Sequence, residues 1–280
     1  MMKSFNVRKV ILTLSGMFII ALLSVKLPSW AVKTRIEHTT YKEIGNNTCG
    51  FGVAQPTESK LQEIMQRNDI KPEHLILIDL RGEPHIFIND YGYYLERQPF
   101  DNIQALFDYE EKLVDNINAG IPVEVKERVA SMEDGKRVVE YLPLEVPAES
   151  TATTEQRIAK KLGVHYIRIA NNDGEVPTMD NIYTFIRIIA PLLKDPNNRF
   201  VIHCYAGLGR TSFFATVLDI LVNARRDTFD TILARQAEKF EKDFAAKKEV
   251  VSKKARVLYK VYDYIRNNTD DFATPPTFEA

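Results

Sequence analysis

The chain has few cysteines, a single tryptophan and almost no net charge. It contains two cysteines among 280 residues, and its 37 basic side chains nearly balance its 38 acidic ones. Two cysteines cannot build the disulfide framework that stabilises many small secreted domains. The balanced charge argues against a protein that binds nucleic acid. The remaining composition, 45% hydrophobic and 27% charged, is that of a globular protein with a sizeable core.

The longest apolar run lies near the N-terminus. Three basic residues precede an uncharged, mostly apolar run at residues 10–25, and small residues at positions 29 and 31 provide a cleavage site. The run is shorter than the about 20 residues that span a bilayer. We expect residues 1–31 to be a cleaved signal peptide, which makes the mature protein secreted or periplasmic without stable membrane association. An uncleaved membrane anchor is the alternative.

Beyond this segment, short apolar runs alternate with helical patterns. The runs at residues 75–80, 165–170 and 200–203 predict buried strands, whereas residues 32–57 look polar and irregular. Helices are expected at residues 57–68, 100–118, 153–162 and 178–193, and again beyond residue 227. This alternation predicts an α/β fold with a central, mainly parallel sheet flanked by helices.

Two segments differ from this pattern. Residues 121–146 alternate between apolar and polar side chains around Asp134 and Gly135, which predicts a β-hairpin in a small β-rich insertion. Residues 269–280 have the composition of a flexible tail. We therefore expect one domain over residues 32–268.

The most informative stretch is the run from Arg199 to Thr211. A buried strand leads into a loop with two glycines, and an apolar helix follows. Such a loop directs free N–H groups at an anion, and the helix dipole favours negative charge there. Cys204 opens the loop and Arg210 closes it six residues later.

This arrangement is suited to nucleophilic attack on a phosphate. The loop amides can surround a tetrahedral oxyanion, and Arg210 can hold two of its oxygens. The same groups favour a thiolate at Cys204, which makes it a nucleophile. We expect Thr211 to hydrogen-bond the sulfur. We expect His203 to belong to the substrate-binding site and to hold the loop in place by bonding its backbone. The residues expected to bind the phosphate are Tyr205, Ala206, Gly207, Leu208 and Gly209.

Two further candidates follow the ends of predicted strands. Arg81 and Asp173 come directly after buried runs, as Cys204 does, so a parallel sheet would bring all three to one edge. Asp173 is either a general acid on a mobile loop or the end of a strand at a turn, with Asp180 as the fallback acid. Arg81 is either a phosphate ligand or the partner of Glu83.

These motifs resemble a known family. The His-Cys-x5-Arg-Thr stretch resembles the phosphate loop of the protein tyrosine phosphatase superfamily, and residues 79–85, 166–178 and 232–236 are similar to its bacterial cysteine phytase-like branch of inositol polyphosphate phosphatases. The resemblance covers residues 45–267. It implies that Asp173 is the general acid, that Arg81 contacts phosphate, and that no metal or cofactor takes part. Tyr205 and Gly174 depart from the branch at positions that touch substrate, so the substrate need not be phytate itself.

The sequence thus predicts a metal-independent phosphomonoesterase that acts through a phosphocysteine, with inositol polyphosphates as the expected substrates. A protein tyrosine or dual-specificity phosphatase acting on phosphoproteins is the first alternative, and an inactive phosphate-binding module is the second. A reversible disulfide between Cys49 and Cys204 remains open at this level.

Overall fold

A computed structural model describes residues 42–44, 49–96, 100–133, 136–147, 149–240 and 249–276. The predicted signal peptide and the predicted turn at residues 134–135 lie outside these ranges. None of the helices within them is both long and apolar enough to cross a bilayer.

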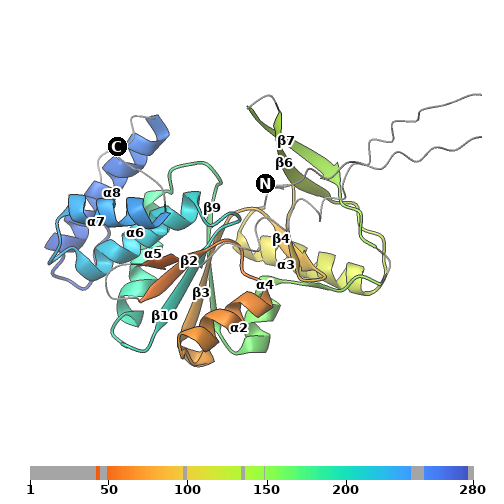
Figure 1. Ribbon diagram of the computed structural model, residues 1–280, viewed down its shortest axis with the longest axis horizontal. Helices are drawn as coiled ribbons and strands as arrows, with labels where there is room; N and C mark the ends of the chain where they lie inside the picture. Colours follow the sequence, from red (N-terminus) through yellow and green to blue (C-terminus); the bar gives the residue numbers. More distant parts are fainter. Residues whose placement is uncertain are drawn as a thin grey trace, which may run out of the picture.

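The centre of the fold is a five-stranded sheet with the order β1-β2-β10-β3-β9 (Figure 1). Strands β2, β10, β3 and β9 run parallel, and only the short edge strand β1 is antiparallel to its neighbour. This confirms the predicted mainly parallel α/β sheet. The bounds are Lys42–Ile44 for β1, Gly50–Val53 for β2, Leu75–Arg81 for β3, His165–Asn171 for β9 and Arg199–His203 for β10.

Strands β1 and β2 lie in a segment that the sequence marked as irregular, and that prediction was wrong. Glycine has a low strand propensity and occupies two of the four positions of β2, which hid the pattern. The structure explains one of these glycines. A Cβ at Gly52 would lie 2.4 Å from the ring of Phe240, so only glycine lets that ring pack against the strand.

Helices cover both faces of the sheet. Alternate residues of β3 point to opposite sides, so Ile76 and Ile78 join one apolar cluster while Leu75 and Leu77 join another. The first cluster receives α5 (Met179–Leu192), α6 (Gly209–Asn223), α7 (Phe229–Phe240) and α8 (Glu249–Asn267). The second receives α2 (Glu58–Arg67) and α4 (Glu155–Leu162), which Figure 1 shows on the other side. A short 3-10 turn, Pro72–His74, leads into β3.

A small β-rich unit stands beside the main sheet. It contains a three-stranded sheet in the order β5-β4-β8 and a separate hairpin of β6 and β7. The bounds are His85–Ile88 for β4, Tyr91–Tyr94 for β5, Lys126–Glu133 for β6, Lys136–Pro143 for β7 and Ala152–Thr153 for β8. Helix α3 (Ile103–Asn118) packs its buried side against this unit. The alternating pattern had predicted the hairpin correctly.

The C-terminal segment is held against the main domain over its described part. Tyr183 on α5 donates to the backbone oxygen of Phe272 at 2.9 Å, and Lys194 pairs with Asp271 at 2.7 Å. We predicted a flexible tail at residues 269–280, but residues 271–273 are hydrogen-bonded to, or paired with, side chains of the α5 region.

Candidate active site

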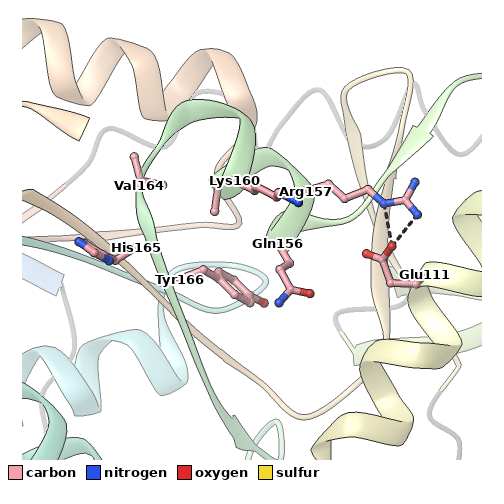
Figure 2. Close-up of a pocket in the computed structure, with 8 residues that line it drawn as sticks. Glu111, Gln156, Arg157, Lys160, Val164, His165 and Tyr166 are labelled. Atoms are coloured by element: carbon pink, nitrogen blue, oxygen red, sulfur yellow. Dashed lines mark hydrogen bonds and ion pairs between the residues drawn. The ribbon is translucent and has the colours of Figure 1, made fainter. Parts of the chain in front are cut away.

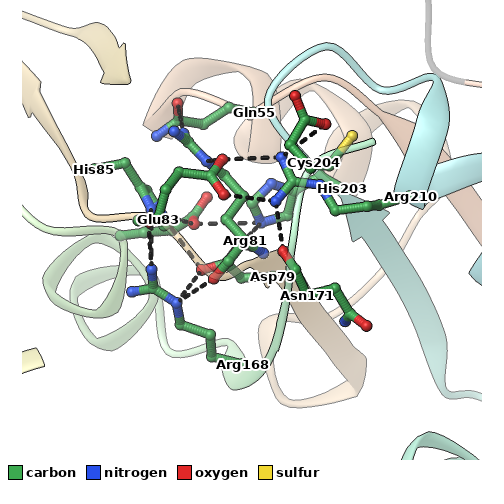
Figure 3. A network of polar contacts seen from close by, with 12 residues as sticks. Gln55, Asp79, Arg81, Glu83, His85, Arg168, Asn171, His203, Cys204 and Arg210 are labelled. Carbon is green, nitrogen blue, oxygen red and sulfur yellow. Dashed lines mark hydrogen bonds and ion pairs between the residues drawn. The ribbon is translucent and has the colours of Figure 1, made fainter. Parts of the chain in front are cut away.

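The loop from Cys204 to Arg210, called the phosphate loop below, connects β10 to α6 (Figure 3). Cys204 is only 3% exposed, and the hydroxyl of Thr211 donates to its sulfur at 3.1 Å. Helix α6 begins at Gly209, and its N-cap residue Leu208 provides no side-chain hydrogen bond. The first N–H groups of α6 therefore remain available to an anion, as the sequence predicted.

Strand β2 supports the phosphate loop from one side. Gly207 has φ +70°, a left-handed conformation that favours glycine, and a Cβ there would lie 2.5 Å from the backbone nitrogen of Ala54. The backbone N–H of Gln55 donates to the oxygen of Tyr205 at 3.1 Å. The loop is therefore shaped by residues just after β2, a strand that the sequence had not revealed.

A buried carboxylate holds Arg210. Both terminal nitrogens of Arg210 donate to Glu83, at 2.6 Å and 2.9 Å, and one also donates to the backbone oxygen of Asn171 at 2.9 Å. Burial alone would raise the pKa of Glu83, but Arg81 and Arg210 outweigh it and lower the pKa to about 2. Glu83 thus stays charged and fixes the guanidinium plane.

Arg81 lies next to the same carboxylate. Its Nε donates to Glu83 at 2.8 Å, and its guanidinium carbon lies 5.0 Å from the ring centroid of Tyr94 and 5.2 Å from that of Tyr205. The pairing with Glu83 that we considered as an alternative is therefore real. It does not use the whole side chain, because within the described residues Nη2 of Arg81 is buried without a hydrogen-bond partner. Arg81 can still donate to an anion.

Asp173 lies in the loop that follows β9. Its carboxylate oxygen is 3.5 Å from Nη2 of Arg210, and its side chain is 38% exposed. The next residue, Gly174, has φ +82° and lets the chain turn there. Asp180 instead lies in the first turn of α5, where the helix dipole suits an acid. The structure thus brings Asp173 to the phosphate loop, together with Cys204 and Arg81.

A network of buried charges lies beneath the loop (Figure 3). His203 Nε2 is 3.2 Å from Glu155, and His85 Nε2 is 3.2 Å from the same carboxylate oxygen. Burial and Arg81 disfavour charge on His85, but Asp79 and other carboxylates outweigh them and raise its pKa from 6.5 to about 9. His203 therefore faces a carboxylate of α4, and within the described residues neither of its ring nitrogens makes the expected bond to the loop backbone.

Part of this network has the spacing of a metal site. Asp79, Glu155 and His203 place ligand atoms within 4.8 Å of one another. However, Nε of Arg168 already lies 3.0 Å from Asp79, and that guanidinium also pairs with Glu110 at 2.8 Å. A cation would face this guanidinium at close range, so the residues do not suit a metal ion.

A pocket among the described residues lies away from the phosphate loop. It has a volume of about 590 Å³ and is lined by residues of α4 and the first residues of β9, including Lys160, His165 and Tyr166 (Figure 2). These residues lie at the opposite end of β9 from Asn171, whose backbone oxygen accepts from Arg210. Arg157 at its edge is already paired with Glu111. This pocket is therefore separate from the phosphate loop.

The two cysteines are too far apart to form a disulfide in this fold. Cys49 lies level with the start of β10, because its backbone oxygen accepts from the N–H of Phe200 at 2.9 Å. Cys204 follows the end of the same strand, so about 16 Å of extended chain separates them. A disulfide needs Cα atoms within about 7 Å. Burial also raises the pKa of Cys49 to about 11, which keeps its thiol protonated and unreactive.

The chain is similar to several known proteins. A curated relative, the effector protein hopD2 of Pseudomonas syringae pv. tomato, is 28% identical over 124 residues, which cover 41% of this chain and 26% of that protein. A solved PTP-like myo-inositol phosphatase from Mitsuokella multacida, in complex with myo-inositol-(1,3,4,5)-tetrakisphosphate, matches with a TM-score of 0.66 at 21% identity, over 86% of this chain and 43% of that one. A PTP-like phytase from Bdellovibrio bacteriovorus matches with a TM-score of 0.59 at 21% identity, over 81% and 83%.

This chain therefore spans about a quarter of the curated relative and less than half of the Mitsuokella chain, and the structural matches show a shared fold. A family model for PTP-like phytases, described as inositol hexakisphosphate, matches residues 78–222, which is just over half of the chain. The chain belongs to the protein tyrosine phosphatase-like phytase family, a family of phosphatases that hydrolyse phosphate monoesters.

Proposed function

We propose that this chain is a metal-independent phosphomonoesterase that works through a phosphocysteine. The proposal is supported by the side chains that lie together at the phosphate loop. Thr211 donates to the sulfur of Cys204 at 3.1 Å, and Arg210 lies between a fixed carboxylate, Glu83, and the exposed carboxylate of Asp173 at 3.5 Å. A nucleophile, an anion-binding group and an acid thus meet at one end of the sheet.

In the first step, the Cys204 thiolate attacks phosphorus, and the bond from phosphorus to the substrate oxygen breaks. Arg210 and the loop amides stabilise the equatorial oxygens, whose charge develops in the transition state. Asp173 gives its proton to the leaving oxygen, which departs as an alcohol. Because Glu83 already fixes the guanidinium, little reorganisation is required when the phosphate binds.

In the second step, water attacks the phosphocysteine. The Asp173 carboxylate, now deprotonated, takes a proton from that water, and the bond from sulfur to phosphorus breaks. The hydroxyl of Thr211 donates to the departing sulfur and stabilises the thiolate. Inorganic phosphate leaves, and Asp173 is again protonated for the next cycle.

Inositol polyphosphates are the substrates we propose. The family model carries the name of inositol hexakisphosphate, and the Mitsuokella enzyme was solved with an inositol tetrakisphosphate. On this chain, the buried donor of Arg81 that has no partner among the described residues lies beside the phosphate loop. It suits a substrate with more negative charge than a single monoester carries.

The test is hydrolysis by the purified chain in a metal chelator. We expect the wild-type chain to hydrolyse both an aryl phosphate and inositol hexakisphosphate. The Cys204→Ser variant should hydrolyse neither. Asp173→Asn should slow an alkyl phosphate far more than an aryl phosphate, because the aryl leaving group needs less protonation. Asp180→Asn, an acid of the α5 first turn, is the matched control and should leave both rates unchanged.

Three results would contradict the proposal. Activity that returns only with added metal would reject the mechanism. Full activity in Cys204→Ser would reject the nucleophile. Faster turnover of a phosphotyrosine peptide than of any inositol phosphate would replace the proposed substrate class with phosphoproteins.

A further inference from the structure

An arginine of the β6–β7 hairpin reaches the surroundings of the phosphate loop. The guanidinium carbon of Arg128 lies 4.8 Å from the ring centroid of Tyr94. The ring of Tyr94 in turn meets the ring of Tyr205 edge to face, with centroids 5.2 Å apart. Tyr205 follows the nucleophile directly, so two aromatic rings connect the hairpin to the loop.

The backbone holds Arg128 in this place. Glu127 forms an antiparallel bridge with Leu95 just after β5, and the N–H of Glu96 donates to the oxygen of Lys126 at 2.7 Å. Within the hairpin, Arg128 pairs with Tyr141. Successive residues of a strand point to opposite faces, so Arg128 shares a face with Tyr141 and not with its neighbour Glu127.

Arg128 forms no ion pair with a carboxylate in the described part of the chain, although the buried carboxylate of Glu127 also lies near Tyr205. No hydrogen bond to a carboxylate joins it there either, whereas Arg81 and Arg210 both pair with Glu83. Arg81 and Arg128 lie 5.0 Å and 4.8 Å from the same Tyr94 centroid, so their guanidinium carbons are no more than about 10 Å apart. Arg128, a half-buried residue whose donors have no carboxylate partner among the described residues, therefore lies close to the phosphate loop.

We propose that Arg128 binds a second phosphate group of the substrate while the phosphate loop holds the first. This inference rests on the proposed function and specifies how the same site selects a polyphosphate. The contact with the Tyr94 ring holds the guanidinium plane of Arg128 in one orientation. A planar guanidinium can donate to two phosphate oxygens at once. A substrate with one phosphate cannot make this contact, so Arg128 contributes to selection among substrates.

The experiment compares kcat/KM for inositol hexakisphosphate with kcat/KM for inositol monophosphate. In Arg128→Ala the ratio of the two should fall about 10-fold to 100-fold, the size of one lost charge-assisted contact. The loss should come mainly from a higher KM for the hexakisphosphate. Arg128→Lys retains the charge but not the planar fork, so its ratio of the two kcat/KM values should lie between those of wild type and Arg128→Ala.

Arg187→Ala is the matched control. This residue also places its guanidinium over a tyrosine, Tyr183, at 5.9 Å, but on α5. It should leave the substrate ratio unchanged. Thermal unfolding of each variant, followed by circular dichroism, identifies any general loss of structure.

The outcomes separate this inference from the proposed function. If wild type prefers the hexakisphosphate but Arg128→Ala retains the same ratio, the role of Arg128 is overturned while the proposed function stands. The same holds if Arg128→Ala loses activity equally on both substrates, since that indicates a structural role. If wild type shows no preference for the hexakisphosphate, the proposed substrate class fails and this inference fails with it.

Discussion

Glu83→Gln tests whether a buried carboxylate holds the catalytic arginine. The substitution keeps the size of the side chain and removes its charge. Glu83 accepts from Arg210 at 2.6 Å and 2.9 Å and from Arg81 at 2.8 Å, and all three side chains are buried. The variant therefore leaves two guanidinium groups without their shared anion.

The expected magnitude follows from the pKa of Glu83. Against the opposing effect of burial, the two arginines lower this pKa from 4.5 to about 2, which corresponds to about 3 kcal/mol of stability at neutral pH. Loss of one partner from a buried ion pair costs a similar amount, about 3–5 kcal/mol. Because the folded-state pKa is lowered, this contribution is complete above pH 4.5 and decreases as the pH falls toward 2.

Urea unfolding at several pH values provides the measurement. Far-UV circular dichroism is the suitable probe, because the only tryptophan, Trp30, lies outside the described residues. We expect Glu83→Gln to be about 3 kcal/mol less stable than wild type at pH 7, with a difference that shrinks by up to about 1.4 kcal/mol per unit below pH 4.5. The rate kcat should also fall, since Arg210 loses its fixed orientation.

Glu63→Gln removes a partly exposed carboxylate that pairs with Lys60 on α2 and should leave the stability unchanged within error. The reasoning is refuted if Glu83→Gln costs less than about 1 kcal/mol at pH 7, or if the difference from wild type is the same at pH 7 and pH 3.5.

Three further predictions concern the same end of the sheet. Gly207→Ala should abolish turnover and lower the stability by at least about 2 kcal/mol, since its Cβ would meet the backbone of Ala54 at 2.5 Å; normal kinetics in this variant would contradict the loop geometry. The raised pKa of His85 should add about 3 kcal/mol of stability below pH 6.5 that is lost as the pH rises to 9, and urea unfolding of His85→Gln should show little of this decline. Thr211→Val should slow breakdown of the phosphocysteine more than its formation, which rapid-quench kinetics would show as a larger initial burst; an equal effect on both steps would exclude the contact with the Cys204 sulfur as the cause.

Features whose residues lie close together in the chain could be predicted from the sequence alone. The phosphate loop has its nucleophile, glycines and arginine within seven positions, so its chemistry could be predicted without coordinates. The alternation of buried strands and helices also follows from local periodicity, and Thr178 caps α5 as expected. Asp173 and Arg81 could be placed near Cys204 because all three follow strand ends, and the carboxyl ends of parallel strands lie at one edge of the sheet.

Contacts between residues far apart in the chain could not be predicted in this way, because they depend on the tertiary packing. Glu83 and Arg210 are 127 positions apart, and no local pattern marks a carboxylate as the partner of one arginine rather than of another. Strand β2 escaped prediction because glycines replace the apolar residues that mark a strand, and the reason for Gly52 is the ring of Phe240 from another helix. The contact of Arg128 with Tyr94, and the separation of Cys49 from Cys204, likewise depend on how strands align. Periodicity reports which side of an element is buried, whereas the partner across a contact is set by packing of the whole chain.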